Sequence, residues 1–222
     1  VRALKAHSGR FALSPGKPLP AGLQQEDVEA LELGLGNLVK HIETLRMFGV
    51  PVVVAVNQFE TDTAREHALV REAALAAGAV SAVSHSAFTW GGPGAEALAD
   101  AVAAACHQPS RFEFLYDERA PIAEKIAAVA TRVYGAADVG YTATARRQME
   151  RYAELGFGHL PVCIAKTHLS LSDNPALKGR PRGFELSVRE IRLSAGAGFL
   201  VPLCGDIRTM PGAETFTGPW SA

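Results

Sequence analysis

The stretch Val50 to Thr63 reads V-P-V-V-V-A-V-N-Q-F-E-T-D-T, and it decides the fold of this chain. Its first half, Val50 to Val56, is a run of β-branched and small apolar residues that is too short for a free-standing helix. Such a run is typical of a strand that is buried on both faces of a parallel sheet. Thr63 and Glu66 then have the spacing of a capping box, which predicts a helix as far as Ala77. The stretch therefore predicts one strand–loop–helix unit of an α/β sheet.

The residues that follow this strand stand where a ligand site is expected. Asn57, Gln58 and Phe59 come directly after the apolar run, and open α/β sheets bind their ligands at the carboxyl ends of the strands. A purely structural interpretation fits the same residues, with Asn57 turning the chain and Phe59 packing under a helix. The stretch alone leaves both interpretations open.

A second strand–loop–helix unit comes next. Ala79 to Val83 is predicted to form a strand, Trp90 follows it before a glycine-rich loop, and a helix is expected from about Ala95 to Ala105. A right-handed crossover would make the two strands parallel neighbours. Phe59 and Trp90 would then reach the same edge of the sheet, where two aromatic rings can hold a flat ring between them. Alternatively, Trp90 covers the core beneath the glycine-rich loop.

Apolar spacing predicts the remaining elements. Steps of three and four before the central strand predict a helix from about Gln25 to Met47 that packs on the sheet. Later in the chain the pattern predicts helices from Pro121 toward Gly135 and from about Thr144 to Leu155, short strands at 112–115, 160–165, 184–188, 191–193 and 198–203, and a β-bulge near Arg189 and Glu190. The predicted fold class is α/β, with a Rossmann-like, mostly parallel sheet flanked by helices and then a smaller strand-rich C-terminal region.

The composition excludes several classes of protein. The 222 residues carry a net charge of −1, which gives no broad electrostatic footprint for nucleic acid or an anionic membrane. No apolar run reaches the roughly 18 residues of a membrane span, and the first residues lack the apolar core of a secretory signal. The three cysteines have no C-x-x-C spacing, so we expect neither a disulfide framework nor a metal site, and we predict a cytoplasmic protein. The chain begins with valine, which we interpret as a piece of a longer protein.

The motifs of common catalytic sites are missing from the sequence. There is no phosphate-binding G-x-x-x-x-G-K-[ST], and Gly34-Leu35-Gly36 lies inside a predicted helix rather than after a strand. His168 stands near two serines, but their spacing gives no base–orienter pair for a nucleophilic site, so we interpret His168 as a loop histidine with local hydrogen bonds. Lys166 and two nearby arginines could bind a carboxylate or phosphate, or could simply be solvated. The residues alone therefore indicate an α/β domain with an aromatic-lined cleft and name no reaction.

Several motifs of this chain resemble formate–tetrahydrofolate ligase, also called formyltetrahydrofolate synthetase. They are the stretches 50–63 (V-P-V-V-V-A-V-N-Q-F-E-T-D-T), 160–172 (L-P-V-C-I-A-K-T-H-L-S-L-S) and 194–199 (S-A-G-A-G-F), together with G-F-G at 156–158, G-R-P-R-G-F at 179–184 and T-M-P-G at 209–212. The resemblance runs in order from Val1 to about Gly212, whereas the tail A-E-T-F-T-G-P-W-S-A at 213–222 departs from it.

The resemblance implies a reaction and its substrates. Members of this family use ATP, with Mg²⁺, to phosphorylate formate, and they transfer the formyl group to tetrahydrofolate without a covalently bound cofactor. It also implies that Phe59 and Trp90 stack on the flat folate rings and that Asn57, Lys166 and His168 are candidate polar residues of the cleft. The phosphate-binding loop of the family lies in an N-terminal domain that this chain lacks. We therefore expect the folate-binding C-terminal part of the enzyme, inactive by itself, with homo-oligomerisation possible.

The predicted organisation has four parts. Residues 1–24 form an opening segment and loop left from the missing N-terminal domain, and residues 25–140 form the Rossmann-like α/β domain. Residues 141–212 form a C-terminal α+β region, and residues 213–222 form an atypical tail. The alternative function is a non-catalytic remnant or a stand-alone α/β domain that binds a folate or a nucleotide.

Overall fold

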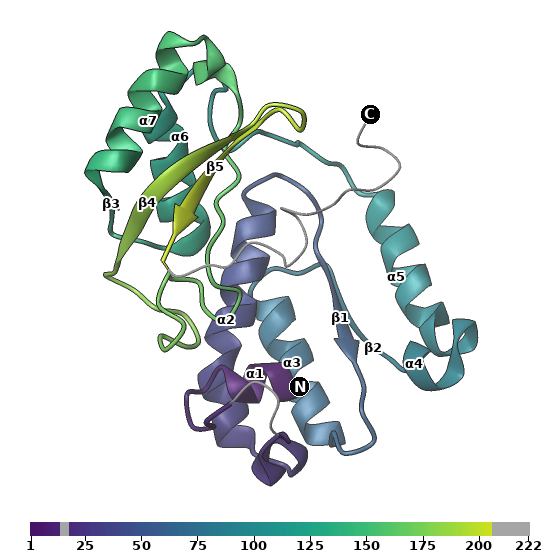
Figure 1. The fold of residues 1–222 in the computed structure, drawn as a ribbon. Coiled ribbons are helices and arrows are strands. Elements are labelled where there is room, and N and C mark those ends of the chain that lie inside the picture. Colours follow the sequence, from purple (N-terminus) through teal and green to yellow (C-terminus); the bar gives the residue numbers. More distant parts are fainter. Residues whose placement is uncertain (14–17, 206–222) are drawn as a thin grey trace, which may run out of the picture.

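The computed structural model describes residues 1–13 and 18–205, and it has two regions that meet along helix α2 (Figure 1). The predicted tail and the motif at 209–212 lie outside the described residues. In chain order the elements are α1 (Arg2–Ala6), η1 (Ala21–Gln24), α2 (Val28–Arg46), β1 (Val53–Asn57), α3 (Ala64–Ala76), β2 (Ser81–His85), α4 (Ala87–Trp90), η2 (Gly92–Ala95), α5 (Glu96–Cys106), α6 (Ile122–Ala128), the π-helical turn η3 (Val129–Tyr134), β3 (Asp138–Tyr141), α7 (Ala143–Glu154), η4 (Phe157–His159), β4 (Glu185–Ser194) and β5 (Phe199–Cys204).

The first region is built around the predicted strand–loop–helix units. β1 and β2 pair in parallel, with Asn57 opposite His85 at the end of both strands. Helix α3 packs against this pair, and α5 contacts both strands as well. In Figure 1 the two strands lie between α3 and α5. The predicted parallel pairing of these strands, with helices flanking them, is confirmed.

Helix α3 begins where its capping box predicts. The hydroxyl Oγ1 of Thr63 accepts the backbone N–H of Glu66 at 3.2 Å, and the Oε2 of Glu66 accepts the N–H of Thr63 at 3.1 Å. These reciprocal bonds satisfy two of the N–H groups that a helix leaves free at its start. The chain after β1 must therefore turn into α3 within a six-residue loop, residues 58–63.

A close approach between α1 and α2 explains why a glycine is present at position 34, for which the sequence alone suggested no role. A Cβ at Gly34 would lie 1.8 Å from the backbone carbonyl oxygen of Leu4. Only glycine lets the two helices come this close at this point. At Gly36, two residues later, the nearest atom would be the Cβ of Arg180 at 3.3 Å. The first glycine of G-L-G is thus required for packing.

The second region is a three-stranded sheet covered by α6 and α7. β3 pairs with β4 in parallel and β4 with β5 in an antiparallel register, which shifts between Val188 and Glu190. This shift confirms the predicted bulge, although the two predicted strands around it form one continuous strand. Buried apolar residues from both helices and the sheet form the largest core cluster, which includes Ile126, Ala145, Leu186, Ile191 and Leu200. The region confirms the predicted strand-rich C-terminal part.

The predicted strand at 160–165 is present only as two separate bridges along β5. Val162 pairs with Leu200 and Ala165 with Leu203, both in parallel. Pro202 lies between these positions and has no N–H group, so it cannot donate the hydrogen bond that would join them into one ladder. The prediction placed the segment correctly but overstated its regularity.

The predicted strand at 112–115 was wrong. The segment has no strand and contacts the rest of the molecule through backbone hydrogen bonds from Arg111 to Gly49 and from Glu113 to Phe48. Phe112 stacks on Phe48 with ring centroids 6.1 Å apart, and it remains exposed. The apolar alternation that suggested a half-buried strand therefore belongs to a surface cluster of aromatic rings.

Lys125 on α6 is a fully buried cation that binds three backbone oxygens. Its Nζ donates to the carbonyls of Glu118 at 3.0 Å, Gly158 at 2.7 Å and Leu160 at 2.7 Å. Burial lowers the pKa of this amine, while Glu118 and Asp117 act in the opposite direction. The lysine joins the start of α6 to the turn that follows α7.

Candidate functional site

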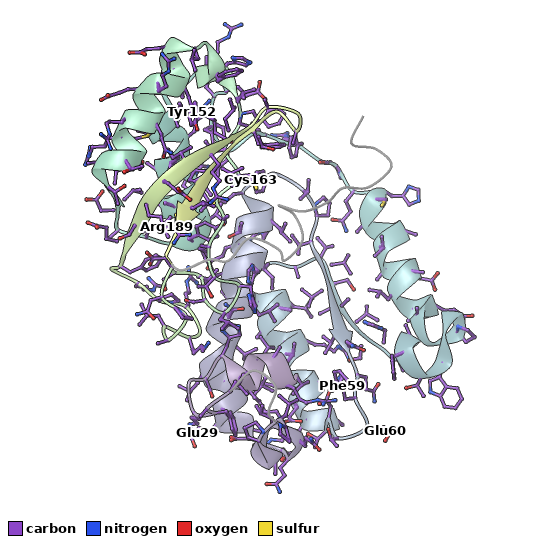
Figure 2. The ribbon with its side chains drawn as sticks, in the orientation of Figure 1. Glu29, Phe59, Glu60, Tyr152, Cys163 and Arg189 are labelled. Atoms are coloured by element: carbon purple, nitrogen blue, oxygen red, sulfur yellow. The ribbon has the colours of Figure 1, made fainter. Side chains whose placement is uncertain are left out.

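The carboxyl ends of β1 and β2 carry the aromatic residues that the sequence singled out. Phe59 lies in the loop after β1, and Trp90 ends the short helix α4 after β2. Figure 2 shows Phe59 and Glu60 on the loop beyond β1, far from Tyr152 in the strand-rich region. Phe59 is 39% exposed and Trp90 70% exposed, and neither belongs to a buried cluster. Both rings are therefore accessible to a ligand.

Two cavities adjoin Phe59. One, of about 320 Å³, lies along β1 and α1 and includes Asn57 in its wall. The other, of about 230 Å³, lies between the β1–α3 loop and α4. The second cavity is lined by Arg2, Gln24, Gln58, Phe59, Glu60, Thr61, Phe88 and Thr89. The structure thus brings Asn57 and Phe59 together at this edge, as the sequence predicted.

Phe88 is a further aromatic residue of this site. It is 94% exposed, lies two positions before Trp90 on α4 and faces the same cavity as Phe59. Trp90 does not line either of the two cavities next to Phe59. The position of Phe88 just after a predicted strand was the available signal, because aromatic residues at strand ends had already singled out Phe59.

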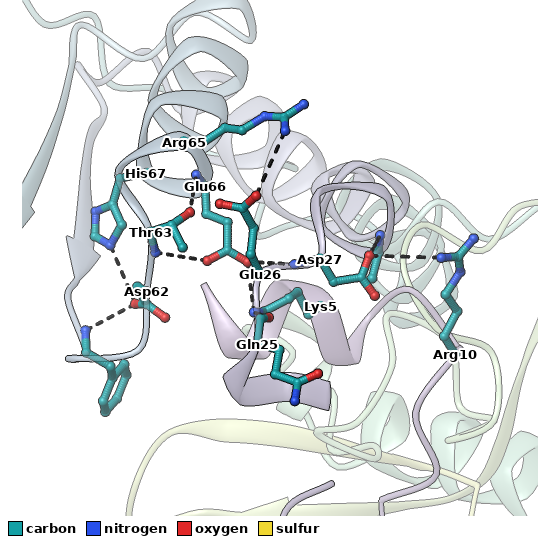
Figure 3. A network of polar contacts seen from close by, with 12 residues as sticks. Lys5, Arg10, Gln25, Glu26, Asp27, Asp62, Thr63, Arg65, Glu66 and His67 are labelled. Carbon is teal, nitrogen blue, oxygen red and sulfur yellow. Dashed lines mark hydrogen bonds and ion pairs between the residues drawn. The ribbon is translucent and has the colours of Figure 1, made fainter. Parts of the chain in front are cut away.

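The loop that carries Phe59 is joined to α3 by a polar network (Figure 3), which a further contact extends to β2. The Oδ2 of Asp62 accepts the backbone N–H of Phe59 at 3.1 Å and lies 3.5 Å from the Nε2 of His67. The Nδ1 of His67 is 2.6 Å from the Oγ of Ser84 on β2. The network sets the path of the loop between the two strand ends.

A buried ion pair fixes α1 against the same loop. The Nζ of Lys5 donates to the Oε1 of Glu66 and to the carbonyl of Gln25, both at 2.8 Å, and both charged side chains are buried. Glu66 also accepts the N–H of Asp27 at 3.2 Å (Figure 3). Burial by itself would raise the pKa of Glu66, but the hydrogen bonds from Lys5, Thr63 and Asp27 outweigh it and hold that pKa below its usual value.

Buried polar atoms without a partner are concentrated at this edge. Within residues 1–13 and 18–205, four such side-chain atoms are the Nε of Arg2, the Oδ1 of Asp62, the Nε2 of His67 and the Nδ1 of His85. Arg2 lines both cavities, Asp62 and His67 belong to the network, and His85 ends β2. Buried polar groups are nearly always hydrogen-bonded, so unpaired ones point to a functional site. Their positions support the β1–β2 edge as the ligand site.

The other two polar residues named from the sequence lie elsewhere. Lys166 is in the strand-rich region, where its Nζ donates to the carbonyls of Thr167 and Ser170 and faces the ring of Tyr134 at 4.6 Å. Burial lowers the pKa of Lys166. His168 is exposed on the same segment. Neither residue lines the two cavities beside Phe59.

Parallel strands with helices on both sides define an α/β protein, and the accessible aromatic rings at the carboxyl ends of the strands mark a candidate ligand site. The comparison with known proteins is more specific. The family model described as formate–tetrahydrofolate ligase matches residues 1–218. The chain therefore belongs to the formate–tetrahydrofolate ligase family.

Individual relatives agree with this assignment. The chain is 49% identical to the formate–tetrahydrofolate ligase of Herpetosiphon aurantiacus, over 96% of this chain and 37% of that protein. It is 47% identical to the cytoplasmic C-1-tetrahydrofolate synthase of Saccharomyces cerevisiae, over 98% of this chain and 23% of the relative, and 50% identical to the human protein of the same name, over 97% and 23%. The chain thus spans only about a quarter to two fifths of the length of these relatives.

Proposed function

We propose that this chain is the tetrahydrofolate-binding part of a formate–tetrahydrofolate ligase. The observation that carries the proposal is the accessible ring of Phe59 at the carboxyl end of β1, in the wall of two cavities. Membership of the family supplies the chemical identity of the flat ring that this site would hold. Under this proposal the folate rings stack on Phe59 and also on Trp90, which lies at the end of the adjacent strand unit but outside the two cavities. Asn57 provides a polar contact at the strand end.

The proposed reaction has two steps, and this chain contributes to the second. ATP transfers its terminal phosphoryl group to a formate oxygen, which gives ADP and formyl phosphate. The nitrogen that joins the pterin to the aminobenzoyl group then attacks the formyl carbon, inorganic phosphate leaves, and the nitrogen loses a proton. The residues at the β1–β2 edge would hold the folate so that its nitrogen meets the formyl carbon, since correct positioning alone can supply a large part of the rate.

The phosphoryl-transfer step is assigned to another part of the longer enzyme. The sequence has no G-x-x-x-x-G-K-[ST] motif for the nucleotide phosphates. Within the described ranges no group of three or more His, Cys, Asp or Glu side chains is placed to hold a metal ion. No step is therefore assigned to a Mg²⁺ ion held by these residues. We propose that an ATP-binding N-terminal domain completes the enzyme, and that Lys166 and His168 contact substrate only in that complete form.

The wider context of the proposal follows the relatives. Two of them are named as cytoplasmic enzymes, and we propose the same location for this chain. None of the described helices is long and apolar enough to cross a membrane. We also propose that the chain divides at residues 24/25, 140/141 and 212/213 and that it associates with further copies of itself.

One alternative has a specific observation in its favour. The missing phosphate-binding motif also fits a stand-alone domain that binds a folate or a nucleotide and catalyses nothing. Binding alone does not separate the two functions. Mixing the chain with a separately expressed ATP-binding part of a relative does, because only the ligase fragment would restore formyltetrahydrofolate synthesis.

Substitution of the two aromatic residues tests the folate site. Stacking of a base on an aromatic ring is worth roughly 1–3 kcal/mol, so Trp90→Ala and Phe59→Ala should each weaken tetrahydrofolate binding by about one to two powers of ten. Isothermal titration calorimetry measures the affinity, and thermal unfolding measures the stability of the same samples. Phe114→Ala is the matched control, because Phe114 is also exposed but lies outside this edge. A loss of about 3–5 kcal/mol in stability without a selective loss of folate affinity would show that the rings serve packing instead.

A further inference from the structure

Arg2 holds a position at the site that the folate-stacking role of Phe59 does not explain. The residue begins α1, and its guanidinium carbon lies 3.6 Å from the centroid of the Phe59 ring. It also lines both cavities that adjoin this ring. A guanidinium that stacks on an aromatic face keeps its N–H groups in its own plane, where they are free to donate. Arg2 therefore presents hydrogen-bond donors beside the ring of Phe59.

The charge of Arg2 is not neutralised by the residues around it. Arg10, Arg65 and Arg180 form ion pairs with glutamates, and Arg46 and Arg132 donate to backbone carbonyls. The side chain of Arg2, by contrast, has no ion pair or hydrogen bond with any residue in the described part of the chain, and its Nε is buried without a partner. Glu60 lines the second cavity but forms no ion pair with Arg2. The other polar groups in that wall are the uncharged side chains of Gln24, Gln58, Thr61 and Thr89.

A half-buried arginine of this kind suits one class of ligand group. Its fork of donors matches the two oxygens of a carboxylate or a phosphate, and such charge-assisted bonds are stronger than neutral ones. The amide and hydroxyl groups in the cavity wall can donate to the same oxygens. A neutral or cationic ligand would leave the guanidinium unpaired after its desolvation, which carries a free-energy cost.

We infer that Arg2 binds an oxyanion, carboxylate or phosphate, of a ligand that occupies the cavity next to Phe59. The inference rests on the proposed function for the identity of the ring that stacks on Phe59. Two sources supply such an oxyanion in the proposed reaction, namely the glutamate carboxylates of tetrahydrofolate and the phosphate of the second substrate. In either case Arg2 binds the oxyanion, while the neighbouring ring of Phe59 stacks on the folate. The two side chains together would then fix the positions of both groups.

The test uses the 222-residue chain and its Arg2→Gln variant, which loses the charge but keeps a polar side chain of similar length. The probes are tetrahydrofolate, tetrahydropteroyl amide, which has the same rings with a neutral amide in place of the glutamate, and inorganic phosphate. Calorimetry measures the affinities, and the ¹⁵N–¹H signal of the Arg2 Nε reports on the side chain itself. Arg65→Gln is the control, since Arg65 is an exposed arginine with a carboxylate 3.9 Å away.

A carboxylate source predicts that Arg2→Gln weakens tetrahydrofolate binding about tenfold or more and leaves the affinity for tetrahydropteroyl amide within twofold. A phosphate source predicts instead that inorganic phosphate shifts the Arg2 Nε signal and that the variant loses this binding, with both pterins unaffected. If neither probe responds to Arg2 and the variant behaves as Arg65→Gln does, the inference is overturned. Should neither pterin bind at all, the proposed folate function fails, while the phosphate titration still decides the role of Arg2.

Should Arg2→Gln unfold the chain, two measurements keep the test decisive. Under the carboxylate assignment the Nε signal of the wild type shifts with tetrahydrofolate but not with tetrahydropteroyl amide, and this measurement needs no variant. Arg2→Lys keeps the charge but loses the paired donors, so it should retain part of the affinity. A wild-type signal that stays unchanged with every probe would also overturn the inference.

Discussion

Removal of Lys5 should destabilise the chain severely, because it leaves the carboxylate of Glu66 buried without its counter-charge. In the structure Glu66 accepts three hydrogen bonds, from Lys5 at 2.8 Å, from the N–H of Thr63 at 3.1 Å and from the N–H of Asp27 at 3.2 Å. Lys5→Met fills a similar volume but removes the cation. Breaking a buried pair in this way typically costs about 3–5 kcal/mol, and the two remaining backbone donors keep the expected loss near the lower figure.

Urea denaturation followed by circular dichroism measures the loss, with an unchanged slope as the sign that only stability has altered. The double variant Lys5→Met, Glu66→Gln provides the internal control. Its amide can still accept from Thr63, and neither charge remains, so it should recover much of the lost stability. Losses that simply add in the double variant, or a loss below about 1 kcal/mol for Lys5→Met, would refute the argument that the pair is coupled.

The same pair predicts how stability depends on pH. The pKa of Glu66 is lower in the folded chain than in the unfolded chain, so the unfolded state takes up a proton first as the pH falls. The contribution of Glu66 is therefore present above its unfolded pKa, about 4.3, and is lost as the pH falls through the lower folded value. Lys5→Met should reduce this acid-side loss, because the folded pKa of Glu66 then rises.

Three further outcomes are expected. The purified chain should form no formyltetrahydrofolate from formate, ATP and tetrahydrofolate, and product above background would contradict the assignment of ATP binding to another domain. Gly34→Ala should cost more stability than Gly36→Ala, since only the first Cβ meets a backbone carbonyl at 1.8 Å, and equal melting temperatures would disprove the packing argument. Burial raises the pKa of the Cys204 thiol to about 12, so iodoacetamide at pH 8 should label the two exposed cysteines of the native chain and leave Cys204 unmodified, as judged by mass spectrometry.

The sequence alone predicted those helices and strands whose local residue pattern agrees with their surroundings in the fold. The run of valines before Asn57 indicates a strand in any context, and the Thr63–Glu66 capping box places the start of α3 at the residue where it begins. The strand at 112–115 failed because its alternation of apolar residues reflects a surface aromatic cluster, which only tertiary contacts reveal. β3 was missed because its four residues include Asp138 and Gly140, neither of which favours a strand.

Some residues of the candidate site could likewise be placed from local sequence, whereas others depend on tertiary packing. The loops after β1 and β2 could be placed at one edge because parallel strands end together, as the pairing of Asn57 with His85 shows. Which aromatic side chain of the second loop lines the cavity beside Phe59 could not be predicted, since it is Phe88 and not Trp90. Arg2 could not be placed there, since it is 57 positions from Phe59 and reaches it only through the packing of α1. Lys166 and His168 follow a segment that pairs with β5, and nothing in their local sequence tells which of the two sheets they adjoin.

Lys125 has a consequence for how this chain resists unfolding. By binding the carbonyls of Glu118, Gly158 and Leu160, it closes a loop of more than thirty residues that contains η3, β3 and α7. A disulfide would close a loop of this size by restricting the unfolded chain, but the described cysteines are all unpaired. The hydrogen bonds of the buried ammonium group instead connect these segments only in the folded state. They place no restriction on the unfolded chain. These hydrogen bonds are insensitive to reducing agents, and they form again without an oxidant each time the chain refolds.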